Sequence, residues 1–360
     1  MDFGPYGGHG SGVVVWGSWW SGVMVLGSGE GRTLNAQDRL KLGVVGVGVM
    51  GRNHARVLAE MAGVELVGIV DPDPKQREAV AATLGCAAFT DLDELLDRGV
   101  DAVTIAAPTH LHHDLAIACI ARGINLLVEK PIAPTVEEGR AIVTAARRAG
   151  VTLMVGHVER FNPAVEAIKR AIQGQDILSI AITRVGPFPP RMSNVGVVID
   201  LAVHDIDLIR WFTDSEIVEI QPQLSSAVAE REDIALLQFR TASGVLAHIN
   251  TNWLTPFKAR TIHVATRAKY LIGDLLTLQV TECFGFQPDG SYSMRHLSTG
   301  YAEPLRAELL AFVKAIRGDH PPAVTGDEGV ASLEIAIRCL DTHAGRANVP
   351  QRKGPRRVVG

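Results

Sequence analysis

A glycine pattern near the start of the regular part of the chain constrains its fold more than any other feature. Gly46, Gly48 and Gly51 have the spacing G-x-G-x-x-G, between an apolar run that begins at Leu42 and a helix-like stretch over Met50–Met61. In this context the first glycine permits a tight turn, the second lets the backbone approach a phosphate, and the third allows close packing of helix on strand. The helix N-terminus favours the phosphate charge. The pattern therefore predicts a βα unit that binds a dinucleotide.

An acid at the end of the next strand-like run narrows the choice of dinucleotide. Asp71 ends the run Val64–Asp71, twenty positions after Gly51. A carboxylate at this place hydrogen-bonds the hydroxyls of the adenosine ribose and repels a 2′-phosphate. Pro72 follows it, where chains that bind NADP often carry Ser or Arg. NAD is therefore the expected cofactor. The other interpretation of Asp71 is a helix cap after the strand.

The order of the remaining runs predicts two kinds of sheet. Strand-like and helix-like runs alternate as far as Val155, and longer strand-like runs then follow one another with only turns between them. The first pattern indicates a doubly wound parallel Rossmann sheet, and the second indicates an α+β domain with a large, open and mostly antiparallel sheet. Two helices are expected near Pro304–Ile316 and Glu328–His343. The open sheet face predicts a homo-oligomer, a dimer or a tetramer. The later strands are expected at Ile177–Val185, Ile217–Leu224, Ile234–Arg240, Val245–Asn252, Ala259–Ala265 and Leu275–Thr281.

We expect the NAD-binding domain over residues 41–157 and the substrate-binding and oligomerisation domain over residues 158–345. Residues 1–40 read as a glycine-rich, disordered extension and residues 346–360 as a basic tail. The apolar part of the extension, Ser11–Gly27, is short for a bilayer span, and no Lys or Arg precedes Arg32. A start at Met24 or later, or a segment that touches a membrane, are the other interpretations.

Composition excludes several classes of protein. The 360 residues have a formal net charge of -4, and apart from the tail no basic block suggests a nucleic-acid partner. Hydrophobic residues make up 47% and charged residues 21%, which is typical of globular domains. The four cysteines form no C-x-x-C pair, so we expect free thiols and a cytoplasmic location rather than disulfides or a zinc ribbon.

Polar residues that suit alcohol oxidation stand at two places. Lys130, in Glu129-Lys130-Pro131, follows a buried strand, where its ammonium can stabilise charge on a reacting hydroxyl. Asp200 and His204 are four apart in a segment predicted to be helical from Val198 to Phe212, so they share one face. A carboxylate beside an imidazole fixes its tautomer and raises its basicity. A salt bridge or cap, or a zinc site with neighbouring histidines, is the alternative; we expect no metal.

Four segments in this order resemble the glucose–fructose oxidoreductase and inositol dehydrogenase (Gfo/Idh/MocA) family: the glycine motif, Ala107–His112, Glu129–Pro131 and Asp200–His204. The resemblance implies that Lys130 is the catalytic lysine, that the bond before Pro131 is cis, and that the His and Asp act at a sugar hydroxyl. We therefore assign His204 as general base and Asp200 as its orienting partner, with Lys130 as the alternative base. The cofactor-binding set comprises Gly46, Gly48, Met50, Gly51, Asp71, Pro108, Thr109, His112, Glu129 and Lys130.

Four further segments look like those of UDP-N-acetylglucosamine 3-dehydrogenases: Gly156–Pro163, Arg184–Arg191, Val197–Asp207 and Asn252–Arg260. This resemblance implies oxidation of the sugar's 3-hydroxyl to a ketone, which an aminotransferase can convert into a 3-amino sugar for lipid A or glycan synthesis. The two phosphates of such a substrate suit cationic side chains. The predicted substrate-binding residues are Arg160, Asn162, Arg191, Asp200 and His204, with Arg184, Lys258 and Arg260 as further cations.

Other functions remain open at this point. Within the same class, the substrate is inositol or a free hexose, or the enzyme is a sugar 3-ketoreductase. In a different class, the chain is an NAD-binding sensor, which needs the glycines and Asp71 but not Lys130, Asp200 and His204 together. A structural protein that uses the open sheet for assembly leaves those polar residues unexplained.

Overall fold

The structure, a computed structural model, describes residues 39–189 and 195–347. Nearly all of the predicted extension and tail, and the predicted substrate residue Arg191, lie outside these ranges. No helix among the described residues combines the length and the apolar character needed to cross a bilayer.

Six parallel strands form the first sheet, in the order β3-β2-β1-β4-β5-β6. This is the Rossmann order, in which the chain reverses direction across the sheet between β1 and β4. The strands are β1 (Leu40–Val45), β2 (Val64–Val70), β3 (Ala87–Phe89), β4 (Ala102–Ile105), β5 (Asn125–Glu129) and β6 (Leu153–Gly156). The helical segments between them are α1 (Val49–Ala59), α2 (Pro74–Leu84), α3 (Leu92–Leu96), η2 (Thr109–Leu111), α4 (His112–Ala121) and α5 (Val136–Ala149).

Eight strands form the second sheet, in the order β14-β13-β12-β11-β7-β10-β9-β8. All neighbours are antiparallel except β7 and β10. The predicted fold class, a Rossmann sheet followed by a mostly antiparallel sheet, is therefore confirmed. The strands are β7 (Ile177–Pro187), β8 (Ile217–Ser225), β9 (Ile234–Thr241), β10 (Leu246–Asn252), β11 (Leu254–Thr266), β12 (Lys269–Asp274), β13 (Gln279–Phe284) and β14 (Ser293–Leu297).

The strand predicted over Leu275–Thr281 is wrong in its first half. Residues 275–278 form the turn between β12 and β13, because the Asp274 carboxylate accepts hydrogen bonds from the N–H groups of Leu276 and Thr277. The leucines give this turn the composition that is typical of a buried strand. No sequence pattern predicted β3, β12 or β14, and β3 has only three residues, too few to show a period.

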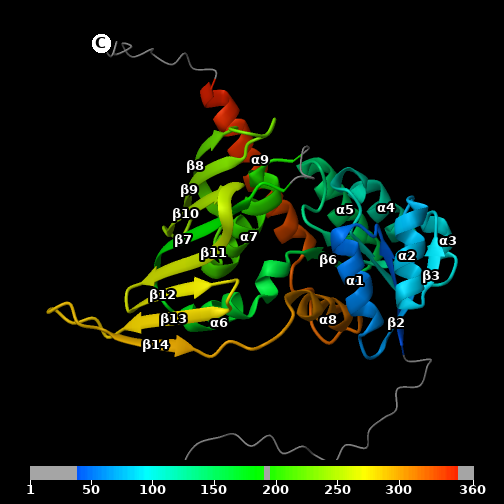
Figure 1. Cartoon of the computed structure of the whole chain (residues 1–360), viewed down its shortest axis with the longest axis horizontal. Helices are drawn as coiled ribbons and strands as arrows, with labels where there is room; N and C mark the ends of the chain where they lie inside the picture. Colours follow the sequence, from blue (N-terminus) through cyan, green and yellow to red (C-terminus); the bar gives the residue numbers. More distant parts are fainter. Residues whose placement is uncertain (1–38, 190–194, 348–360) are drawn as a thin grey trace, which may run out of the picture. The chain divides into compact units, whose positions relative to one another are not determined.

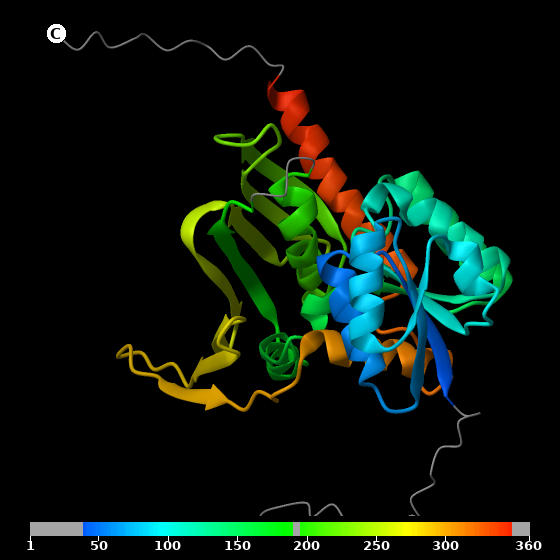
Figure 2. The same cartoon turned by 45° about the vertical axis from the view of Figure 1, so that its right-hand side comes forward.

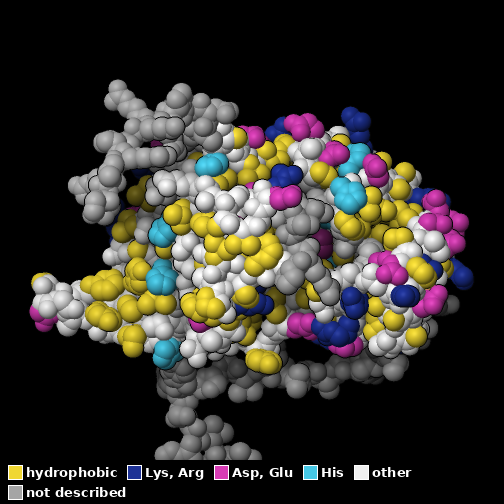
Figure 3. Space-filling model, turned by 45° about the horizontal axis from the view of Figure 1, so that its top comes forward, with side chains coloured by type: hydrophobic (Ala, Val, Ile, Leu, Met, Phe, Trp, Pro, Cys, Tyr) yellow, Lys and Arg dark blue, Asp and Glu magenta, His cyan; other side chains and the backbone are white. Residues whose placement is uncertain are grey.

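Helices cover one face of the second sheet and leave the other open (Figure 1). Residues of α6 (Pro163–Ile172), α7 (Val203–Thr213) and α9 (Gly326–Ala347) share one hydrophobic core with the inward side chains of the strands. Along β9, buried and exposed side chains alternate, as expected for a sheet covered on one side. The open face exposes large apolar side chains: Leu178, Leu236, Leu246 and Ile272. Figure 3 shows hydrophobic side chains at the surface of the molecule.

The last two helices connect the two sheets. Helix α8 (Pro304–Ile316) packs against α1, and its Leu309 and Phe312 belong to the core of the Rossmann sheet. Helix α9 contacts β6 and α5 as well as β8, so it runs from the first sheet to the edge of the second (Figure 2). The polar residues that follow β5 and β6 therefore face residues that the second half of the chain supplies.

Candidate active site

The glycine turn has the geometry that a bound phosphate requires. Gly46 has φ +84°, and a Cβ there would lie 2.7 Å from the Cα of Ala107. A Cβ on Gly51 would lie 1.8 Å from the carbonyl oxygen of Gly46. A Cβ on Gly48 would meet no atom within 4 Å, so this backbone is open where α1 begins. Two glycines therefore shape the turn and the third leaves room for a ligand, which fits a dinucleotide.

Asp71 lies at the end of β2 beside this turn. Its Oδ2 accepts a hydrogen bond from the N–H of Val47 at 2.8 Å, and its Oδ1 accepts one from the N–H of Asp73 at 2.9 Å. The cap of α2 is Asp73, whose side chain accepts a hydrogen bond from the N–H of Lys75. The alternative interpretation of Asp71 as the helix cap is therefore wrong. Each Asp71 oxygen keeps a lone pair for a ribose hydroxyl.

His112 joins two loops at the carboxyl edge of the first sheet. Its Nδ1 lies 2.9 Å from the carbonyl oxygen of Pro131, and its Nε2 lies 2.8 Å from that of Ala107. The ring is buried, and burial lowers its pKa although the two carbonyls act in the opposite direction. Because both ring nitrogens face backbone, His112 positions the loops rather than contacting a cofactor. Pro108 in the same loop is exposed, and Thr109 is half-buried.

The ammonium of Lys130 is held by a single residue from the second half of the chain. Its Nζ donates to the carbonyl oxygen of Asp200 at 2.7 Å and lies 3.2 Å from the Asp200 Oδ1. The bond between Lys130 and Pro131 is cis, as the family resemblance implied. The predicted helix from Val198 begins with a π-turn over Val198–Ala202, and α7 follows it.

These contacts correct the predicted role of Asp200. The spacing in the sequence paired it with His204, four residues on. In the structure its carboxylate pairs with Lys130, and the buried Nδ1 of His204 has no hydrogen-bond partner among the described residues. A π-turn does not keep the α-helical spacing on which that prediction relied. Asp200 is therefore a partner of the lysine, not of the imidazole.

His204 is a neutral imidazole close to Lys130. Burial, and then the positive charges of Lys130 and Arg184, hold its pKa well below the ordinary 6.5. Its ring lies edge-on to that of His157, with centroids 5.8 Å apart. His157 directly follows β6 and is also buried. A neutral ring has a free lone pair that can accept a proton, and the lowered pKa makes it a weaker base than a free imidazole.

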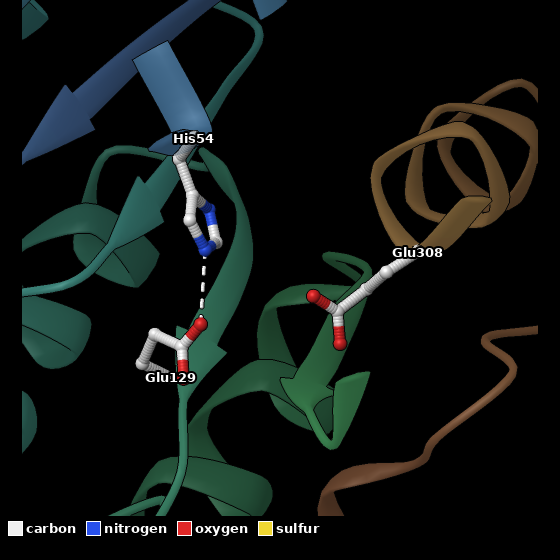
Figure 4. A group of neighbouring side chains, drawn as sticks. All are labelled: His54, Glu129 and Glu308. Carbon is white, nitrogen blue, oxygen red and sulfur yellow. Dashed lines mark hydrogen bonds and ion pairs between the residues drawn. The ribbon is translucent and has the colours of Figure 1, made fainter. Parts of the chain in front are cut away.

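A second buried cluster includes Glu129, the residue before Lys130 in the chain (Figure 4). The Nε2 of His54, on α1, lies 2.9 Å from an oxygen of Glu129, and the other oxygen of Glu129 accepts from the N–H of Lys130 at 3.1 Å. Burial favours the neutral form of Glu129, but the hydrogen bond and charge of His54 and the charge of Lys130 lower its pKa. The contact joins the helix that begins at the glycine turn to the residue before Lys130, the predicted catalytic lysine. Glu129 is thus a positioning residue.

Glu308, on α8, points towards the same cluster. It is fully buried, and neither carboxyl oxygen has a hydrogen-bond partner among the described residues. Burial and the charge of Glu129 raise its pKa well above the ordinary value. The three side chains are close enough to share a metal ion. A metal ion would require Glu308 in its deprotonated form, and its charge would itself lower the pKa of that carboxyl.

Two predicted substrate residues have internal roles. The guanidinium of Arg160 is buried, contacts both oxygens of Asp207 at 2.7 Å, and contacts Glu328 at 2.7 Å. Asn162 caps α6 through the N–H of Ala164 and donates to a backbone carbonyl. This geometry does not support the expected contact of Arg160 with a substrate phosphate, because its charge is already neutralised inside the protein.

Arg184 is likewise internal, whereas Arg260 reaches a cleft. Arg184 is 3% exposed and binds Asp205 and Glu159. Arg260 contacts the same Glu159 oxygen at 3.0 Å, but its side chain is 35% exposed. Among the described side chains of the predicted phosphate set, Arg260 therefore combines exposure with proximity to the catalytic centre.

The amino-acid sequence matches a known family over both halves. Residues 40–157 match the oxidoreductase family with an NAD-binding Rossmann fold, and residues 179–271 match the GFO/IDH/MocA C-terminal domain. The chain belongs to the GFO/IDH/MocA family. It is an NAD-dependent dehydrogenase.

Members of the GFO/IDH/MocA family with different substrates are similar to this chain. UDP-N-acetylglucosamine 3-dehydrogenase of Acidithiobacillus ferrooxidans is 30% identical over 83% of this chain and 96% of its own length. Its solved structure has a TM-score of 0.79 over 85% of this chain and 98% of the other, at 28% identity. Inositol 2-dehydrogenase of Rubrobacter xylanophilus is 31% identical over 88% of this chain and 93% of its own length. GenD2 of gentamicin A biosynthesis, solved in complex with NAD, has a TM-score of 0.74 at 25% identity, over 85% of this chain and 95% of that one.

Sequence reasoning missed several residues of this GFO/IDH/MocA site. His157 follows β6, the neighbour of β5, so the expectation that ligands lie at the carboxyl ends of parallel strands could have singled it out. His54 and Glu308 had no such signal. Each is one polar residue on a helix face, and only the packing of α1 and α8 brings them to Glu129.

Proposed function

We propose that this dehydrogenase uses NAD to oxidise the 3-hydroxyl of UDP-N-acetylglucosamine to a 3-keto sugar. The observation that carries the proposal is the ammonium of Lys130, held by Asp200 beside the neutral imidazole of His204. The similarity to UDP-N-acetylglucosamine 3-dehydrogenase over most of both chains supports the choice of sugar. NAD, when bound, supplies the hydride acceptor.

The cofactor's pyrophosphate would lie at Gly48 and the start of α1, and its adenosine ribose at Asp71. Met50, Pro108 and Thr109 stand around this site. Met50 and Pro108 are exposed, so their side chains are free to contact the nicotinamide half. Gly46, Gly51, His112 and Glu129 shape and position the site without an exposed side chain of their own.

The residues of the chain divide the chemistry between them. Lys130 donates a hydrogen bond to the reacting hydroxyl and stabilises the negative charge that develops on its oxygen. His204 accepts the hydroxyl proton, because its imidazole is neutral and close to Lys130. Asp200 balances the charge of the lysine and, through its carbonyl oxygen, orients the ammonium. Buried surroundings strengthen each of these electrostatic contacts.

Oxidation of inositol or a free hexose is the second candidate. Arg160 and Arg184 are neutralised inside the protein, which leaves fewer cations for two substrate phosphates than the sequence suggested. Inositol dehydrogenases are also about as similar in sequence as the UDP-sugar enzyme. A site lined by neutral hydrogen-bonding groups would suit a free polyol.

The test is the rate of NADH formation with purified protein, NAD and a panel of substrates. The panel contains UDP-N-acetylglucosamine, UDP-glucose, N-acetylglucosamine, myo-inositol and scyllo-inositol. Oxidation of UDP-N-acetylglucosamine alone, with the 3-keto product identified by mass spectrometry after borodeuteride reduction, supports the proposal. Oxidation confined to inositol or to free sugars overturns it in favour of the second candidate.

Two further parts of the proposal concern partners. A 3-keto sugar is a substrate for transamination, so a pyridoxal-dependent aminotransferase is the class of enzyme that would consume the product. The open face of the second sheet, with Leu236 and Leu246 exposed, would pack against a second copy. Sedimentation at micromolar protein tests this, because Leu246→Glu should shift an oligomer towards monomer.

A further inference from the structure

A cleft of about 450 Å³ opens beside the catalytic centre. Its walls come from the first turn of α1, from the 3-10 turn η3 (Val158–Phe161) after β6, from the turn between β12 and β13, and from the start of α8. The catalytic assignments of Lys130, Asp200 and His204 do not use it. Its volume is within the range of sites that hold small organic ligands.

The cleft has an apolar part and a polar part: its polar lining includes Asn53, Asn162, Glu159 and Glu303, of which Glu303 pairs with Arg56. Leu275, Leu276, Leu278 and Leu305 line it, with Met50 at the α1 side. Leu276 is 46% exposed, so its side chain offers free surface to a planar, partly apolar group. This combination suits a nucleobase, which stacks or packs through its face.

Arg260 also lines the cleft, and it is the one cation among the described residues that do so. One of its NH groups contacts Glu159 at 3.0 Å, and its side chain is 35% exposed. The negative charge of Glu159 is offset by Arg184 as well, at 2.6 Å. Arg260 therefore keeps donors for an anion. A guanidinium fork matches a phosphate in shape and charge.

Arg260 also lies within electrostatic reach of the reacting groups. Its charge helps to lower the pKa of His204, and the charge of Lys130 helps to lower the pKa of Glu159. A ligand that places a hydroxyl at Lys130 and His204 and a phosphate at Arg260 would thus reach into the leucine-lined end.

We propose that this cleft is the subsite for the nucleoside diphosphate half of a nucleotide-sugar substrate. Arg260 contacts the phosphates, and Leu276 and its neighbours pack against the base. This inference rests on the proposed function, because a free polyol has no group to fill the subsite. It also assigns the discrimination between the two candidate substrates to Arg260.

The experiment measures binding of UDP to the protein saturated with NAD, by titration calorimetry, for wild type and three variants. Arg260→Gln should weaken UDP at least about tenfold, since a charge-assisted contact is lost. Leu276→Glu, at an exposed position, should weaken UDP as well by placing a negative charge in the cleft. Arg267→Gln is the matched control, because that arginine is 75% exposed on the turn after β11 and should leave UDP binding unchanged.

Steady-state kinetics separate a substrate subsite from a part of the cofactor site. With UDP-N-acetylglucosamine, Arg260→Gln should raise KM by a factor similar to the loss in UDP affinity, with kcat changed only a few-fold and KM for NAD unchanged. Unchanged UDP affinity in Arg260→Gln and Leu276→Glu, or a loss of NAD affinity instead, overturns the proposal. The latter would assign the cleft to the cofactor.

The outcome also distinguishes the subsite from the proposed reaction. If UDP-N-acetylglucosamine is not oxidised but UDP binding depends on Arg260, the choice of sugar fails and the nucleotide subsite is supported. If UDP-N-acetylglucosamine is oxidised and its KM does not depend on Arg260 or Leu276, the reaction is supported and the subsite is overturned.

Discussion

The Nζ of Lys130 lies 2.7 Å from the carbonyl oxygen of Asp200 and 3.2 Å from the Oδ1 of the same residue. One residue thus holds the ammonium of Lys130 by both main chain and side chain. Because Asp200 lies in a π-turn seventy positions away, the placement of the lysine depends on how the second half of the chain packs against the first.

The pairing predicts strong coupling between Lys130 and Asp200. Lys130→Met should lower kcat at least about 10²-fold, because it removes stabilisation of the transition state, while NAD binding changes by less than several-fold. Asp200→Asn should lower kcat less, because the carbonyl contact remains. In a double-mutant cycle the two effects should be far from additive. The exposed Lys75→Met is the control. Additive effects would contradict the pairing with Lys130 and would favour the predicted role of Asp200 as the orienting partner of His204.

The neutral state of His204 predicts the acid side of the pH–rate profile. Its pKa lies well below 6.5, so the basic form stays populated as pH falls through 6.5, and kcat/KM should decline only at lower pH. The charge of Arg260 contributes to this lowering, so the decline in Arg260→Gln should move to higher pH. Rates with saturating NAD from pH 5 to 9 check both points. A wild-type inflection above 6.5 would contradict the assignment.

The buried Glu308 predicts a stability that depends on pH. The pKa of Glu308 is raised in the folded state. Its contribution to the free energy of unfolding is therefore fully present below the pKa of the unfolded state, about 4.5, and is lost as pH rises towards the pKa of the folded state. The loss is at most about 1.4 kcal/mol per pH unit. Glu308→Gln removes this pH dependence. Relative to wild type, the free energy of unfolding of the variant should therefore increase as pH rises from 5 to 8. Urea titrations measure this.

The test of Glu308 has a control variant and an outcome that would contradict the prediction. Glu334→Gln, at an exposed residue on α9, should show no such change with pH. If Glu308→Gln is instead destabilised more at pH 8 than at pH 5, the carboxyl is ionised in the folded protein. Ligation of a metal with His54 and Glu129 would then become the better assignment for this cluster.

The internal pairing of Arg160 predicts a loss of stability rather than of substrate affinity. Arg160→Gln leaves Asp207 and Glu328 without their cation, and breaking a buried pair costs about 3–5 kcal/mol. Arg140→Gln, which breaks an exposed pair with Glu334, should cost no more than about 1 kcal/mol. Urea unfolding compares the two. A stable Arg160→Gln with a raised KM for the sugar would restore the substrate role that the sequence suggested.

Local patterns predicted much of the site because they depend on neighbours in the chain. The turn through Gly46 and Gly51 forms where no side chain fits, and Asp71 follows its strand directly. Alternating runs likewise predicted most strands and helices in order. They did not predict β3, β12 and β14, and they placed a strand on the turn over residues 275–278.

Partners distant in sequence could not be predicted in the same way. The sequence by itself determined the Rossmann sheet, the cofactor turn and the presence of Lys130, Asp200 and His204. Only the tertiary structure decided that Asp200 pairs with the lysine, that Arg160 is neutralised by Asp207, and that Arg260 stays partly exposed. The reason is that a charged side chain pairs with whichever opposite charge the packed core brings within reach. The spacing of residues in the sequence does not indicate which charges the packing brings together.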